Sequence, residues 1–272
     1  MSYATNGDYE LYYEIAGPRD GRPLLLVGGF TAQLVSWQDG FVDGWVERGY
    51  RVITMDNREV GLSTKSQTSD TALYSLSAMA ADCLAVLDAA EVERAHVFGN
   101  SMGGMIVQTI AIEHPTRVEA LVSVMSTTGD PAVGRPSAEA LSALTSVGPD
   151  ERSAFIDHYV ATSRVYCGPR FDEAWTRVRA GREFDRGRQP AGAVHQMRAI
   201  IAGGDRTERL GSVDLPTLVV HGRADTLIAF DGGEATAAAI PGARLLALDE
   251  MGHNLPISYW PEIYAAVGAL SA

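Results

Sequence analysis

Cysteine, lysine and long hydrophobic runs are scarce in this sequence. Its two cysteines, Cys83 and Cys167, lie far apart and match no redox or zinc-binding spacing, so we expect a reducing, cytoplasmic environment. No stretch of about 18 uncharged apolar residues is present, and no membrane-spanning segment is therefore predicted. The first residues contain neither a basic region nor an apolar run, so the sequence predicts no secretory signal.

Positive charge is also scarce. The chain has 22 Lys and Arg residues against 34 Asp and Glu residues, which gives a net charge of -12 at pH 7. Binding to nucleic acid needs a basic surface that releases counterions from the phosphates, so nucleic acid is excluded as a partner. No group of residues has metal-ligand spacing, and we expect neither a metal nor another cofactor. The oligomeric state stays open, because the sequence shows no uncommitted apolar stripe.

What the sequence does contain is enough apolar material for one buried core: of 272 residues, 46% are hydrophobic and 21% are charged. Short apolar runs alternate with longer helical patterns, which is typical of an α/β protein with a mostly parallel central sheet and helices on both faces. Residues 9–16 alternate in polarity and are expected to form an antiparallel edge strand. The predicted core strands cover residues 24–27, 51–55, 95–98, 120–124, 217–220 and 244–248, and the predicted helices cover 71–89, 102–114, 231–239 and 258–270.

The alternation stops between residues 128 and 211. No strand candidate lies there, and helical patterns cover residues 138–146, 150–164 and 191–202. We therefore expect one core, and a helical lid inserted into it that would cover the carboxyl edge of the sheet, where α/β proteins bind their ligands. The predicted division is 1–127 and 212–272 for the core and 128–211 for the lid.

One short motif carries the strongest chemical signal. Gly99-Asn100-Ser101-Met102-Gly103 is a G-x-S-x-G sequence between a predicted strand and a predicted helix. A serine at such a sharp turn is held in a strained conformation with its hydroxyl exposed, and the flanking glycines let strand and helix approach closely. The pattern alone also fits a glycine-rich turn at the start of a helix, so the remaining residues decide.

A serine hydroxyl is a weak nucleophile and needs a base within hydrogen-bond reach, oriented by a third group. Of the six histidines, His253 lies in a loop directly after the last predicted core strand, whereas the others fall in strands, at a helix end or in the lid. Asp225 follows the predicted strand at 217–220 and is the favoured acid, with Asp130 as the alternative, whereas Asp249, although close to His253 in sequence, is expected to be a loop or strand-end residue. We expect Ser101, Asp225 and His253 to meet at one sheet edge as a catalytic triad.

The order Ser, Asp, His, together with the motif around Ser101, resembles the α/β-hydrolase superfamily over essentially the full length outside the lid. Residues 26–30, Leu-Val-Gly-Gly-Phe, match the place of the family's oxyanion loop, and residues 55–63 are similar to its D-x-R-x-x-G-x-S turn. Within the superfamily, the sequence most resembles bacterial esterases of the aclacinomycin methylesterase type and the cofactor-free haloperoxidase or perhydrolase group.

The resemblance implies an esterase that acts on a small-molecule ester. The family usually begins its oxyanion loop with His-Gly, where this chain has Gly28-Gly29. By analogy, the backbone N–H groups of Phe30 and Met102 form the oxyanion hole. Ser101 would then attack the ester carbonyl, and water would release the acyl group.

Other activities on this fold remain open. Carbon–carbon bond hydrolases, lactonases and perhydrolases keep the serine triad, so the motif does not separate them from esterases. A small-molecule receptor without turnover is the alternative from a different class, because the fold alone does not fix the function. Epoxide hydrolases and haloalkane dehalogenases use an aspartate at the position of Ser101, so they are excluded.

The lid leaves the substrate undetermined. Tyr159, Phe184 and Met197 are candidates for pocket lining, and equally for the lid's own core. Seven arginines make the lid locally basic, which fits either an anionic or polar substrate or a solvated face paired with nearby acids. The arginines are Arg164, Arg170, Arg177, Arg179, Arg182, Arg186 and Arg188, and the acids are Asp172, Glu173, Glu183 and Asp185.

Overall fold

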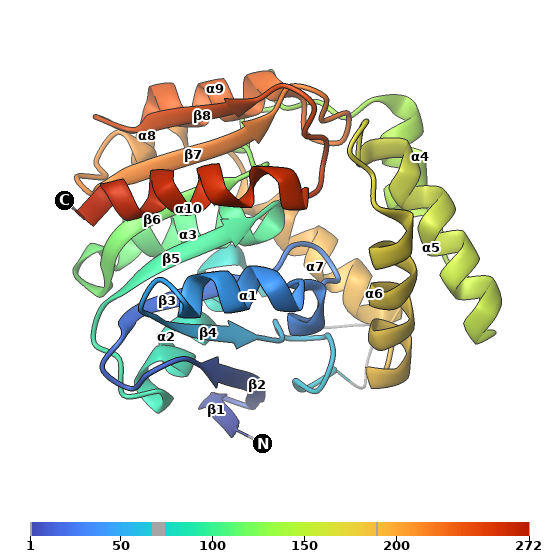
Figure 1. The fold of residues 1–272 in the computed structure, drawn as a ribbon, viewed down its shortest axis with the longest axis horizontal. Coiled ribbons are helices and arrows are strands. Elements are labelled where there is room, and N and C mark those ends of the chain that lie inside the picture. The colour runs from blue at the N-terminus through green and yellow to red at the C-terminus, as the bar shows by residue number, and fades with distance from the viewer. Residues whose placement is uncertain (1, 67–73, 189, 272) are drawn as a thin grey trace.

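A central β-sheet dominates the fold (Figure 1). The computed structural model describes residues 2–66, 74–188 and 190–271, and there eight strands form one sheet in the order β1-β2-β4-β3-β5-β6-β7-β8. Strands β3 to β8 run parallel, whereas β1 and β2 pair antiparallel, which confirms the α/β class. The strands are β1 (Ser2–Asn6), β2 (Tyr9–Ala16), β3 (Arg22–Val27), β4 (Tyr50–Met55), β5 (Ala95–Asn100), β6 (Val118–Val124), β7 (Thr217–Gly222) and β8 (Arg244–Leu248).

The expected edge position of β2 is wrong. All residues of β1 pair with residues 9–13 of β2, so β1 forms the edge of the sheet instead. The chain reverses between the two strands at Gly7, whose φ of 58° favours glycine. The two-residue turn Gly7-Asp8 is the signal that could have revealed this hairpin, because such turns often join antiparallel strands.

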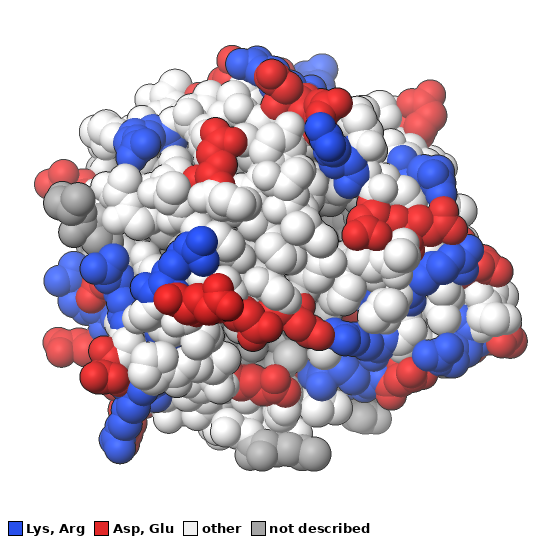
Figure 2. Space-filling view, viewed as in Figure 1, with Lys and Arg blue, Asp and Glu red and all other residues white. Residues whose placement is uncertain are grey.

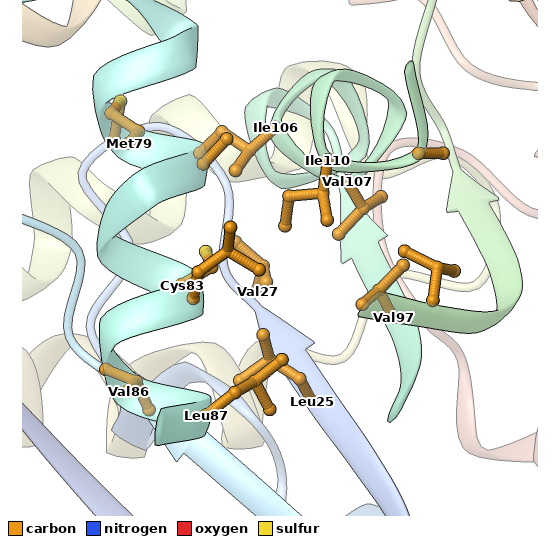
Figure 3. Close-up of a cluster of buried hydrophobic side chains, with 14 of the residues drawn as sticks. Leu25, Val27, Met79, Cys83, Val86, Leu87, Val97, Ile106, Val107 and Ile110 are labelled. Carbon is orange, nitrogen blue, oxygen red and sulfur yellow. The ribbon is translucent and has the colours of Figure 1, made fainter. Parts of the chain in front are cut away.

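Helices cover both faces of the sheet. On one face, α1 (Asp39–Val46) and α10 (Trp260–Gly268) pack over a cluster of aromatic side chains. On the other face lie α2 (Leu76–Ala89), α3 (Met102–Glu113) and α9 (Phe230–Ala239). Figure 3 shows this second layer, with Leu25 and Val27 of β3 beside Leu87 and Cys83 of α2.

The predicted helices agree with the structure apart from their ends. The part of the 71–89 prediction before residue 74 lies outside the described residues. Helix α1 was not predicted, because its sequence DGFVDGWV is short and contains two glycines. Short 3-10 helices lie at Leu34–Ser36, Pro115–Arg117, Ile257–Tyr259 and Ala269–Ser271.

The chain between β6 and β7 is an insertion that, in its described part, contains helices and no strand. Figure 1 shows α4, α5 and α6 side by side at the end of the sheet toward which the parallel strands point. The helices are α4 (Ala138–Thr145), α5 (Arg152–Tyr166), α6 (Glu173–Arg186), α7 (Pro190–Gly203) and α8 (Thr207–Leu210). Within the described ranges, no helix of the protein has the length and apolar character needed to cross a bilayer.

Candidate active site

Ser101 sits at the sharp turn between β5 and α3. Its φ of 55° and ψ of -121° are unusual for a residue with a side chain, and its backbone N–H donates to Val124 O at 2.9 Å. Close backbone packing explains the neighbouring glycines, because a Cβ at Gly103 would lie 2.1 Å from Val27 O and one at Gly99 would lie 2.1 Å from Gly103 O. The fold stabilises this strained turn, which presents the serine at the carboxyl edge of the sheet.

Asp225 and His253 lie side by side in the loops after β7 and β8. His253 Nδ1 is 2.7 Å from Asp225 Oδ2, and Asp225 is only 5% exposed. The other carboxylate oxygen accepts hydrogen bonds from the N–H groups of Leu227 and Ile228, both at 2.9 Å. Because a carboxylate oxygen accepts, Nδ1 carries the proton, which leaves Nε2 of a neutral His253 as an acceptor.

The alternative acids lie elsewhere. Asp130 accepts a hydrogen bond from the N–H of Ala132, and Asp249 lies 3.2 Å from the Arg223 guanidinium. Neither contacts His253 among the described residues. Of the three acids considered from the sequence, the structure brings Asp225 to the histidine.

Of the remaining histidines, His221 occupies a packing position and His158 lies in the insertion. His221 is fully buried at the end of β7, where Nε2–H donates to Ile228 O at 2.9 Å and braces the loop that carries Asp225. Burial lowers the pKa of His221, so it stays neutral. His158 of the insertion pairs with Ser146 at 3.1 Å and lines the same cavity as Ser101.

Gly29 brings the loop that follows β3 directly against Ser101. A Cβ at Gly29 would lie 3.1 Å from Ser101 Cβ, so only glycine fits there without displacement. The backbone N–H groups of Phe30 and Met102 donate to no acceptor in the described part of the chain. Phe30, Met102 and Ser101 all line one cavity, which is described below, so the two N–H donors are available to a ligand there.

Gln196, which belongs to none of the sequence motifs above, fixes this loop. Gln196 of α7 accepts the N–H of Thr31 at 2.7 Å and donates to Arg58 O at 3.0 Å. Thr31 has a φ of 57°, so the hydrogen bond holds a strained backbone in place. The partners of Gln196 lie more than a hundred positions away, and no local pattern would have revealed it.

Residues 56–63, the D-x-R-x-x-G-x-S segment, also support the loop that follows β3. Asp56 is fully buried and accepts the N–H groups of Leu34 at 2.7 Å and Leu62 at 2.8 Å. It also accepts a hydrogen bond from Arg186 of the insertion. Burial raises the pKa of Asp56, against the opposing effect of these donors. The segment thus fastens the loop after β3 and the end of α6 to the core.

A cavity of about 1050 Å³ lies between the sheet edge and the insertion, and Ser101 and His253 both line it. No hydrogen bond joins Ser101 Oγ to His253 within the described residues. Tyr159 and Met197 line the cavity as candidates from the sequence, whereas Phe184 packs against Phe155 with ring centroids 5.4 Å apart. Other apolar lining residues include Trp37, Met105, Trp175, Leu227 and Leu255.

The arginines of the insertion are mostly paired with carboxylates. Arg177 pairs with Asp157 and Glu173, and Arg182 pairs with Asp39 of the core. On the face drawn in Figure 2, basic and acidic side chains alternate over the insertion side of the molecule. These contacts support the interpretation of a solvated, paired face. Four arginines of the insertion also line the cavity, namely Arg170, Arg179, Arg188 and Arg198.

Comparison with known proteins supports the same fold and chemistry. The family model described as alpha/beta hydrolase fold matches residues 22–258. The chain is 30% identical to a rhodomycin D methylesterase, DnrP, from Streptomyces peucetius, over 97% of this chain and 96% of the relative. It is 29% identical to a non-heme chloroperoxidase from Burkholderia pyrrocinia, over 84% of each protein.

Solved structures show the same architecture. A structure described as "Est816 as an N-Acyl homoserine lactone degrading enzyme" matches with a TM-score of 0.74 and 26% identity, over 99% of this chain and 98% of that one. An esterase from Rhodococcus sp. ECU1013, RhEst1, matches in fold with a TM-score of 0.79 at 20% identity, over 98% of each chain. Because the family model matches most of this chain, the chain belongs to the α/β-hydrolase fold family.

Proposed function

We propose that the protein is a serine esterase that cleaves a carboxylic ester of a small molecule. Ser101 is the nucleophile, His253 the base and Asp225 the acid that orients it. The observation that carries the proposal is the 2.7 Å contact between Asp225 and His253, at the rim of a cavity that Ser101 also lines. The similarity to a methylesterase over nearly the whole chain supports ester chemistry.

The mechanism follows from the tautomer of His253. With its Nδ1 proton held by Asp225, Nε2 accepts the proton of Ser101 Oγ as the oxygen attacks the ester carbonyl. The bond to the alcohol oxygen breaks, and His253 returns the proton to the leaving alcohol. Water then attacks the acyl-enzyme with the same base. The N–H groups of Phe30 and Met102 stabilise the oxyanion, each contributing about 3 to 4 kcal/mol to the barrier reduction.

The division of the chain belongs to the same proposal. Residues 1–127 and 212–272 form the catalytic core, and residues 128–211 act as a lid that encloses the substrate. The nucleophile, the base and the oxyanion donors all come from the chain, so the mechanism requires no metal or other cofactor. The two cysteines are buried and free, which fits the proposed cytoplasmic location.

Active-site labelling tests the nucleophile. A fluorophosphonate probe is expected to form one adduct, mapped to Ser101 by peptide mass spectrometry. Ser101→Ala should abolish labelling and reduce ester hydrolysis by roughly 10⁴- to 10⁶-fold. Ser126→Ala is the matched control and should still be labelled, because the Ser126 hydroxyl only donates to Ser101 O at 2.9 Å. An adduct elsewhere would overturn the assignment.

A substrate panel separates the esterase from its alternatives on the same triad. Aryl and alkyl esters, lactones, vinylogous diketones, and an ester with added peroxide should be compared by kcat/KM. The proposal expects the esters to be the best substrates. A preference for lactones or diketones would reassign the reaction, and single-turnover hydrolysis with a large thermal shift would indicate a receptor.

A further inference from the structure

Arg179 of α6 is a charged side chain in a mainly apolar cavity. It lines the cavity, and 28% of its side chain is exposed. Its Nε donates to Glu183 Oε1 at 2.8 Å, one helical turn further along α6, and its guanidinium lies 5.6 Å from the centre of the Tyr159 ring on α5. In the described chain its remaining N–H groups make no hydrogen bond. Glu183 therefore fixes the orientation of the Arg179 guanidinium through Nε, and the two terminal nitrogens are free to donate hydrogen bonds.

Arg179 is positively charged. Burial lowers its pKa, but Glu183 and the neighbouring Tyr159 outweigh this effect, and the net pKa is raised. The guanidinium is also close enough to lower the pKa of Tyr159, Tyr166 and Cys167, each of which burial raises. Tyr166 packs edge-on against His253 at 6.1 Å between ring centroids. Arg179 thus lies within electrostatic reach of Tyr166 and Cys167, both of which contact His253.

Of the other arginines that line the cavity, two bind a carboxylate or backbone carbonyl oxygens, and the third is exposed to solvent. Arg170 pairs with Glu250, and Arg188 donates to the carbonyl oxygens of Gly148 and Pro149. Arg198 is exposed. Arg179 therefore differs from them in combining a partly buried position with two terminal nitrogens that make no hydrogen bond within the described residues.

We propose that Arg179 is a specificity-determining residue that binds an uncharged oxygen acceptor, such as a ketone carbonyl, on the otherwise apolar body of the substrate. This inference rests on the esterase function proposed above and narrows its substrate class. The acceptor is a second group, apart from the ester carbonyl that the oxyanion donors hold.

The charge balance decides against an anionic group. Glu183 already neutralises Arg179, and only 7% of the Glu183 side chain is exposed. A carboxylate on the ligand would place a second negative charge beside the buried Glu183 carboxylate, with one guanidinium to balance both, which is costly. A carbonyl oxygen accepts from the free guanidinium edge without changing the net charge. A hydrogen bond from a charged donor is worth enough to favour such a ligand by about 10-fold or more.

Binding of three naphthalenes of similar size tests this without turnover. The affinities of 2-acetylnaphthalene, 2-ethylnaphthalene and 2-naphthoate should be measured by titration calorimetry on the intact protein. The ketone is expected to bind about 10-fold more tightly than the hydrocarbon, and the carboxylate more weakly than the ketone. Arg179→Met should remove the preference for the ketone and leave binding of the hydrocarbon within about 2-fold, since the aliphatic volume is retained.

Two further variants keep the test decisive. Arg179→Met leaves Glu183 without its partner, so the double variant Arg179→Met, Glu183→Gln removes that buried charge if the single variant folds poorly. Arg177→Met is the matched control on the same helix, because Arg177 pairs with Asp157 and Glu173 at the surface, and it should keep the full ketone preference.

Equal affinities for ketone and hydrocarbon, tighter binding of naphthoate, or a preference that survives in both Arg179 variants would overturn the inference. Its failure is distinguishable from that of the esterase function. A protein that binds the ketone selectively but hydrolyses no ester contradicts only the function, and an esterase without the ketone preference contradicts only the role of Arg179.

Discussion

Two arginine–carboxylate pairs, one in the core and one in the helical insertion, have the same geometry in opposite surroundings. Arg58 binds Asp82 through two hydrogen bonds of 2.6 and 2.7 Å, and Arg152 binds Asp185 through two of 2.8 Å. The core side chains are 5% and 1% exposed, whereas those of the insertion are 51% and 56% exposed. Because the hydrogen-bond geometry is nearly the same, we expect burial to decide what each pair contributes to stability.

The same difference separates the functions of the two regions. Where the two regions meet, the buried Gln196 of the insertion donates to Arg58 O of the core and accepts the N–H of Thr31, in the loop that carries Phe30. On the proposed mechanism, buried contacts of this kind fix the position of the reacting groups. In the insertion, most charged contacts are at the surface, and the inner face shapes the cavity. Changes in the core should therefore affect catalysis or folding strongly, and surface changes in the insertion should have little effect.

Among the changes that compare the two regions, the largest effect is expected at Asp225, a buried carboxylate of the core. Asp225→Asn presents an amide N–H to His253, so Nδ1 becomes the acceptor and the proton moves to Nε2, where it blocks proton transfer from Ser101. On the proposed mechanism, kcat/KM for an ester substrate should fall by about 10⁴-fold. Steady-state hydrolysis measures this, with circular dichroism to verify folding.

Asp249→Asn is the control for that variant. Asp249 lies in the loop before His253, but it pairs with Arg223 and its side chain is 85% exposed. Its activity should stay within about 2-fold of the parent, as is usual for surface changes. If Asp225→Asn kept comparable activity, Asp225 would have no role in orienting the base.

The same contrast explains which features were predictable. The parallel strands β3 to β7 are mostly buried on both faces, so their sequences are largely apolar runs, and the expected catalytic residues Ser101 and Asp225 closely follow two of them. Helix α6 was not predicted, because its buried residues are Thr176, Ala180, Gly181 and Glu183, which form no hydrophobic stripe. The roles of Gln196 and Arg179 depend on contacts between distant segments, which no local pattern contains.

The buried pair of the core should dominate the effects on stability. Arg58→Met leaves Asp82 buried with only the amide of Asn6, at 2.8 Å, as a remaining side-chain partner. The free energy of unfolding should fall by about 3 to 5 kcal/mol, measured by urea denaturation. Replacing both partners, as Arg58→Met with Asp82→Leu, should recover much of this loss, because no unpaired charge remains. If Arg58→Met were as stable as the parent, burial would not decide what such a pair contributes to stability.

The smallest effect is expected for the matching change in the insertion. Arg152→Met removes the same two hydrogen bonds, but both partners are in water, which solvates the freed Asp185 carboxylate and screens the lost attraction. The urea midpoint should therefore shift only slightly, and the shift should shrink further in 1 M salt at roughly a 3 Å screening length. A destabilisation comparable to that of Arg58→Met, and insensitive to salt, would mean that the pair between α5 and α6 holds the insertion together. Surface exposure would then be a poor guide to which contacts the insertion needs.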